Sequence, residues 1–149
     1  MEGADHMSTS SLRDNQKLMK EGLIRFSDDG GGPPHLLASR CSKCGKVYFP
    51  AKQFCTECMN EQMEEIALSN YATLYTRTVV YMGVKGFETP YILGWVDLPE
   101  KVRLVTQIDY DPQKASDLHP GQKLELVIGK LRSLADGTEI IGYKYRPVN

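Results

Sequence analysis

Alternating apolar and polar side chains dominate the C-terminal half of the chain and predict β-strands. The longest alternation spans residues 71–82, where every second side chain falls on the same face of an extended chain. One face is expected to hold Ala72, Leu74, Thr76, Thr78, Val80 and Met82. Four further strands are expected at residues 91–97, 102–108, 123–130 and 140–145.

The connections between these strands indicate how the sheet closes. A tight turn is expected at Pro99 and Glu100, and Asp136-Gly137 is a strong hairpin signal. Glycines inside the strands let a sheet bend sharply, which favours a small closed barrel. Five strands with a long connection at residues 109–121 favour an OB-fold, and a small β-sandwich is the alternative.

A helical pattern precedes the strands. Over residues 12–26 four apolar side chains recur at helical intervals and share one face: Leu12, Met19, Leu23 and Phe26. Such a helix either packs against its own domain or docks on a partner, and the pattern does not separate the two. These four residues are therefore our candidate partner-binding set.

Glycines and prolines then interrupt the pattern. Residues 27–34 read Ser-Asp-Asp-Gly-Gly-Gly-Pro-Pro, which neither a helix nor a strand accommodates, so they predict a linker. We therefore expect three parts: an N-terminal helix and linker at 1–34, a metal-binding module at 35–63 and the barrel at 64–149.

The metal-binding module is predicted from two C-x-x-C pairs, Cys41 with Cys44 and Cys55 with Cys58. Each pair offers two thiolates on one tight turn, and two such turns make a tetrahedral four-sulfur site that Zn²⁺ favours. Iron, as in the electron-transfer rubredoxins, and two disulfides are the alternatives. These are the only four cysteines of the chain, so none is left as a nucleophile.

The charge balance narrows the function classes. Lys and Arg number 18 against 19 Asp and Glu, which argues against a general nucleic-acid binder because such proteins carry a basic excess. The sequence has no apolar run long enough to span a membrane and no signal-peptide pattern, so we expect a soluble cytoplasmic protein without a membrane partner.

No catalytic constellation stands out in the sequence. The histidines are His6 in the N-terminal tail, His35 beside the linker and His119 before a proline in a turn. No Ser-His-Asp arrangement or pair of carboxylates accompanies them. Nucleophilic catalysis needs an activated nucleophile and a base, so we expect another chain to supply it.

Taken together, residues 12–147 resemble a family long filed as a domain of unknown function. The resemblance is carried by LASRCSKCGKVYFP at 37–50, CTEC at 55–58, LYTRTVV at 74–80, PYILGWVDL at 90–98, HPGQKL at 119–124 and YRP at 145–147. It implies a mainly β protein with an N-terminal helix, a rubredoxin-like zinc ribbon and a five-stranded OB-fold barrel. Family members usually have proline after the third cysteine, where this chain has Thr56.

The resemblance also implies a function. Its members are similar to small partners of thiolases, of thiolase-like aldolases and of an archaeal thiolase–hydroxymethylglutaryl-CoA synthase assembly. It therefore implies a non-catalytic accessory subunit that binds a thiolase-like catalytic subunit and helps to hold coenzyme A (CoA) or acyl-CoA. The N-terminal extension is similar to that of small thiolase subunits acting on benzoylsuccinyl-CoA in anaerobic toluene breakdown.

CoA recognition requires cations for its phosphates and a flat surface for its adenine. Candidates are Arg40, Lys43, Lys46 and Lys52 in the ribbon, and Lys85 with Phe87 in the loop at residues 83–90. A solvated charged face is the alternative explanation of these residues. The alternative function is nucleic-acid binding through base stacking on Tyr75, Tyr81 and Trp95.

Overall fold

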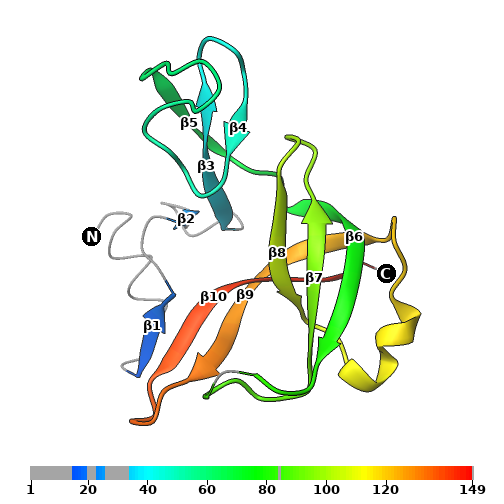
Figure 1. Ribbon diagram of the computed structural model, residues 1–149. Coiled ribbons are helices and arrows are strands. Elements are labelled where there is room, and N and C mark those ends of the chain that lie inside the picture. Colours follow the sequence, from blue (N-terminus) through cyan, green and yellow to red (C-terminus); the bar gives the residue numbers. More distant parts are fainter. Residues whose placement is uncertain (1–14, 20–22, 26–33, 84, 149) are drawn as a thin grey trace.

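The structure is a computed structural model that describes residues 15–19, 23–25, 34–83 and 85–148 of the 149-residue chain (Figure 1). These residues form strands and one short 3₁₀ helix, η1 (Pro112–Asp117). They make up two bodies, a small ribbon and a larger barrel. Within the described residues, no helix has the length and apolar character needed to cross a membrane.

The barrel consists of five strands: β6 (Tyr71–Val80), β7 (Tyr91–Asp97), β8 (Arg103–Ile108), β9 (Lys123–Ser133) and β10 (Glu139–Pro147). The strand order β10-β8-β7-β6-β9 closes through the pairing of β9 with β10. Only the β8–β10 pair is parallel among these described strands. The predicted five-stranded barrel is thereby confirmed, with η1 in the long connection between β8 and β9.

The core of the barrel is filled by inward-facing side chains of every strand. Leu74, Ile92, Val96, Leu124 and Tyr145 are almost completely buried. Burying a leucine or isoleucine side chain contributes about 1.5–3 kcal/mol, so these positions dominate the stability of the barrel.

A β-bulge between Leu74 and Thr76 breaks the alternation expected for β6. The expectation that Thr76 and Thr78 share a face with Leu74 was wrong. Beyond the bulge both threonines are exposed, whereas Val79 packs against the core. The extra residue in a bulge shifts every later side chain to the opposite face, and no sequence alternation reveals it.

The predicted helix over residues 12–26 was also wrong wherever the segment is described. β1 (Gln16–Leu18) pairs in parallel with β10, and β2 (Ile24–Arg25) pairs with β3 (His35–Cys41). The segment is extended because its backbone pairs with the two sheets. The Met19 N–H donates to the Ile141 carbonyl at 2.6 Å, and the Leu37 N–H donates to the Leu23 carbonyl at 2.8 Å. Leu12, Phe26 and the linker at 27–33 lie outside the described residues.

The ribbon is built on β3, which pairs on either side with β4 (Val47–Tyr48) and β5 (Met63–Ala67). β5 continues this sheet across the domain boundary expected after residue 63. The first half of β3 places Leu36 and Ala38 in the barrel core, and its last residue, Cys41, belongs to a separate cluster in the ribbon. One strand thus joins the two bodies.

Candidate functional site

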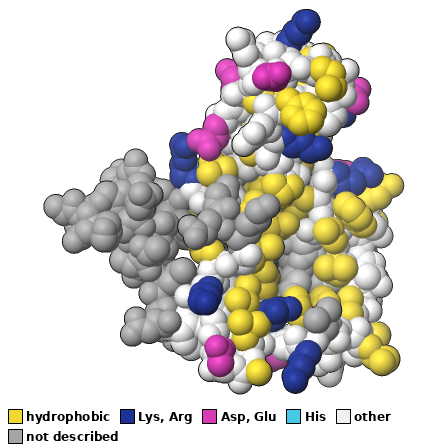
Figure 2. Space-filling view, turned by 60° about the vertical axis from the view of Figure 1, so that its left-hand side comes forward, with side chains coloured by type: hydrophobic (Ala, Val, Ile, Leu, Met, Phe, Trp, Pro, Cys, Tyr) yellow, Lys and Arg dark blue, Asp and Glu magenta, His cyan; other side chains and the backbone are white. Residues whose placement is uncertain are grey.

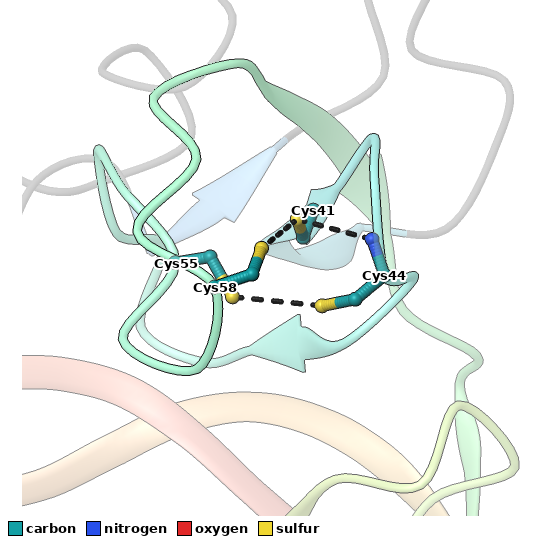
Figure 3. Close-up of side chains that lie close together, drawn as sticks. All are labelled: Cys41, Cys44, Cys55 and Cys58. Carbon is teal, nitrogen blue, oxygen red and sulfur yellow. Dashed lines mark hydrogen bonds between the residues drawn. The ribbon is translucent and has the colours of Figure 1, made fainter.

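The four cysteines meet at the end of the ribbon that lies away from the barrel (Figures 1 and 3). Cys41 ends β3, and Cys44 follows on a turn in which the Gly45 N–H donates to the Cys41 carbonyl. Gly45 has a φ of 81°, a conformation that glycine adopts without strain. The second turn is closed by the Met59 N–H, which donates to the Cys55 carbonyl at 2.8 Å.

The sulfur atoms have the spacing of a four-thiolate metal site. All four lie within 4.8 Å of one another, with 3.4 Å between Cys41 and Cys58 and 3.6 Å between Cys44 and Cys55. A tetrahedral zinc site with Zn–S bonds of about 2.3 Å places its sulfurs about 3.8 Å apart, so the residues fit the ion. The cysteines are free thiols, which disfavours the disulfide alternative.

Hydrogen bonds favour the thiolate form at two of the four positions. The Cys44 N–H and the Asn60 side-chain amide donate to Cys41 Sγ, and they lower the pKa of Cys41 to about 5. The Tyr48 hydroxyl lowers the pKa of Cys55 in the same way. Because thiolates rather than thiols bind metal, these contacts prepare the site for a cation.

Tyr48 connects the second cysteine turn to the rest of the ribbon. Its hydroxyl lies 3.3 Å from Cys55 Sγ and accepts the Thr56 N–H at 3.2 Å. Lys46 and Lys52 lie over its ring at 5.5 and 5.0 Å from the centroid, where cations attract the π-electrons. Thr56, which replaces the usual proline, therefore supplies an N–H that helps to fix the tyrosine.

We expect Tyr48→Phe to weaken metal binding by about 10–100-fold, the range found when outer contacts of metal ligands are removed. The phenyl ring keeps its packing but no longer donates to Cys55. Competition with a chromophoric chelator measures the affinity, and Tyr71→Phe, at an exposed position on the barrel, is the matched control. Equal affinities of Tyr48→Phe and wild type would contradict this role.

Three of the four ribbon residues expected to bind CoA already have partners within the ribbon. Arg40 pairs with Glu64 at 3.2 Å, and Lys46 pairs with Glu57 at 3.5 Å. Lys52 lies over Tyr48, and Lys43 is exposed. All four belong to the ribbon, which forms one end of the molecule (Figure 1).

The loop residues Lys85 and Phe87 lie at the opposite end, beside the β9–β10 hairpin (Figure 1). The structure therefore does not bring the two candidate sets together. Phe87 contacts Tyr91, with ring centroids 5.5 Å apart, and the guanidinium of Arg132 lies 5.7 Å from its ring.

Sequence reasoning missed a groove beside this loop. The groove has a volume of about 210 Å³ and brings together three cations, Lys130, Arg132 and Lys144, with Glu88 and Asp109. Local alternation does not reveal it, because a β-bulge lies between Lys130, which pairs with Ile141, and Arg132, which pairs with Ile140. We had ended the fourth strand at residue 130, whereas β9 continues to Ser133.

Two family models match this chain, one over the ribbon and one over the barrel. Residues 28–64 match the ChsH2 rubredoxin-like zinc ribbon domain, and residues 65–129 match the ChsH2 C-terminal OB-fold domain. The first match agrees with the spacing of the four sulfurs, and the second agrees with the five-stranded barrel.

Several known proteins are similar over most of their length. The benzoylsuccinyl-CoA thiolase subunit BbsA of Thauera aromatica is 35% identical over 146 residues, covering 93% of this chain and 99% of that protein. BbsA of Geobacter metallireducens is 35% identical over 118 residues, covering 79% and 78%. A DUF35 domain-containing scaffold protein of Methanocaldococcus jannaschii is 36% identical over 118 residues, covering 76% and 82%.

A solved structure shows a similar fold. One chain of the Ltp2-ChsH2(DUF35) aldolase superimposes with a TM-score of 0.60 at 24% identity, over 76% of this chain and 84% of that chain. The family matches and the similar proteins confirm the resemblance drawn from the sequence, and the solved structure agrees with it in fold.

Proposed function

We propose that this chain, which belongs to the ChsH2-type family of proteins joining a rubredoxin-like zinc ribbon to an OB-fold, is an accessory subunit of a thiolase-type acyl-CoA enzyme. The observation that carries the proposal is the match to the Thauera thiolase subunit, which extends over 99% of that protein. The candidate reaction is thiolysis of benzoylsuccinyl-CoA, and the cytoplasmic location stays a prediction.

The proposal assigns the chemistry to a separate catalytic subunit. Thiolysis needs a cysteine nucleophile and a base, and all four cysteines of this chain lie in the metal-type cluster. Of the two described histidines, His35 lies 3.2 Å from the Leu68 carbonyl, and His119 follows η1 in an exposed turn. Neither has a cysteine beside it in sequence or a sulfur contact among the described residues.

Zinc, in this proposal, has a structural role. Cys41, Cys44, Cys55 and Cys58 hold it, and four thiolates complete a tetrahedral site without an open position for substrate. When bound, the ion supplies the cross-link that a ribbon of three short strands lacks. Cys41 then ties the first cysteine turn to β3, and Tyr48 of β4 holds the second turn through Cys55 and Thr56.

For the CoA head group we favour the groove beside Phe87 over the ribbon. In the ribbon, Arg40 and Lys46 have carboxylate partners, and in the groove Lys130 pairs with Glu88 at 3.1 Å. The groove also holds Arg132 and Lys144, and it lies beside an aromatic pair. Cations for the phosphates and a ring for the adenine are the two features that CoA needs. Phe87 remains a candidate because it contacts two lining residues, Tyr91 and Arg132, and Lys85 remains one as its neighbour in the same loop.

Arg132→Ala in the assembled complex is expected to weaken CoA binding by about tenfold, because hydrogen bonds to charged groups contribute about 1.5–3 kcal/mol. Calorimetric titration with CoA measures the change. Lys43→Ala, on the exposed ribbon, is the control and should bind CoA as wild type does. The reverse result, with Lys43→Ala weakened and Arg132→Ala unchanged, would favour the ribbon.

Reconstitution tests the function itself. A tagged form of this chain is recovered from its native cells, and the co-purifying thiolase-like chain is identified by mass spectrometry and purified separately. We expect no thiolysis of benzoylsuccinyl-CoA from this chain alone and full activity only from the two chains together. Activity of this chain alone, or salt-sensitive oligonucleotide binding without a protein partner, would contradict the proposal.

A further inference from the structure

An exposed aromatic and apolar surface covers the outer side of the barrel on β7 and β8. Trp95, the only tryptophan of the chain, is 44% exposed, and its cross-strand partner Val105 is 41% exposed. Their neighbours Val96 and Leu104 are buried, so the outward direction of the pair follows from the strand geometry. In an OB-fold these central strands carry the ligand-binding face.

Arg103, the cation on the outer side of this surface, already has partners. Arg103 donates to both carboxylate oxygens of Asp97, at 2.6 and 3.0 Å, and its guanidinium stacks on Tyr75 at 3.6 Å from the ring centroid. A nucleic-acid-binding face needs cations free to pair with phosphates. Here Arg103 pairs with Asp97 and stacks on Tyr75, so neither Arg103 nor Tyr75 is free to bind a nucleotide. The outer side of the surface therefore suits an uncharged partner segment.

Two hollows flank the Trp95–Val105 pair. The first, of about 250 Å³, is lined by Thr76, Thr78 and Leu93 as well as by the pair itself. Arg77 is the one charged residue among the described residues that line it. It pairs in register with the buried Gly94, and its Nε is buried without a hydrogen-bond partner among the described residues. A hollow beside an exposed tryptophan can receive an apolar side chain, the arrangement found at the centres of protein interfaces.

The second hollow, of about 400 Å³, continues the surface from Val105 to the ribbon. Phe49 and Pro50 from the ribbon border it together with Met19 and Tyr143, and Phe49 packs edge-on against Tyr143 with ring centroids 5.7 Å apart. Figure 2 shows hydrophobic side chains in a band that runs down the barrel from below the ribbon. The surface therefore extends over both bodies.

We infer that this surface, defined by Trp95, Val105 and the two hollows beside them, is where the catalytic subunit docks, through an uncharged apolar segment. The inference rests on the proposed function and adds to it the location and chemistry of the interface. It moves the partner contact from the helix expected at residues 12–26 to the barrel. Met19 keeps a place at the edge of the second hollow.

Binding of the purified catalytic subunit to variants of this chain tests the inference. Trp95→Ala is expected to raise the Kd at least about tenfold, as for an aromatic residue at an interface centre, and Val105→Glu is expected to do the same by introducing a charge. Met82→Ala is the control, since Met82 is 93% exposed but lies outside the surface, and its Kd should not change. Circular dichroism and zinc content show that each variant is folded.

The possible results separate the inference from the proposed function. Wild-type affinity of both Trp95→Ala and Val105→Glu would overturn the inference while leaving the accessory-subunit function intact. Failure of the wild-type chain to bind the catalytic subunit would overturn both. Loss of oligo-dT binding, or of self-association, in Trp95→Ala without any effect on the catalytic subunit would assign the surface to nucleic acid or to a second copy and overturn the inference.

Discussion

Replacing Cys41 with serine should abolish tight metal binding and unfold both cysteine turns. Structural zinc contributes about 10–16 kcal/mol in isolated zinc-binding peptides, far more than three short strands can replace. Cys41 is also the sulfur that accepts from the Lys43 and Cys44 N–H groups and from Asn60, so its loss removes those contacts as well.

Metal analysis and hydrogen exchange measure this effect. Metal content should fall from about one equivalent to near zero, and the amides of Cys44 and Cys55 should lose protection while those of β7 keep it. Chelation of the wild-type metal should reproduce the same pattern. Gln53→Ala is the control, since Gln53 is exposed on the ribbon and lies outside the sulfur cluster. A full equivalent of metal, bound with wild-type affinity, in Cys41→Ser would refute the four-thiolate site.

Leu36→Ala should destabilise the protein by about 2–5 kcal/mol, the usual cost of truncating a fully buried leucine. Leu36 lies on the ribbon strand β3 but has no exposed surface, because it packs in the barrel core. The substitution therefore leaves a cavity where the two bodies join. It should lower the stability of the barrel although the residue belongs to the ribbon.

Denaturant unfolding, followed by circular dichroism and tryptophan fluorescence, measures the loss. Leu37→Ala is a close control, since Leu37 is the next residue on β3 and is only half-buried on the other face. We expect it to cost less than about 1.5 kcal/mol, in proportion to its smaller burial. Equal losses for the two variants would show that Leu36 has no special role in joining the bodies.

Some elements could be predicted because their signals are local. The spacing of the four cysteines gave the sulfur cluster, and the alternation around Trp95 gave β7 at its observed bounds, Tyr91–Asp97. The Asp136-Gly137 hairpin was correct as well, since Gly137 adopts a φ of 90° between β9 and β10. Each signal depends on residues that are close together in the chain.

The features that could not be predicted depend on distant partners. β1 is a strand because β10 offers backbone groups to it, more than a hundred residues later in the chain. The bulge after Leu74 depends on the register with β7, and the groove around Arg132 depends on how β9 and β10 fold back together. None of these has a local sequence signature, since each reflects pairing across the barrel.

The pairing of β1 with β10 has a consequence for the behaviour of the protein in concentrated solution. β9 pairs along one edge of β10, and the other edge is shared by β8 at Lys144 and Tyr145 and by β1 at Glu139–Ile141. An uncovered strand edge is a template on which a second molecule can add its own strand. Deleting residues 1–19 should therefore make the protein aggregate faster than the full-length chain, which light scattering would detect, although the deletion removes no residue of the barrel core or the cysteine cluster.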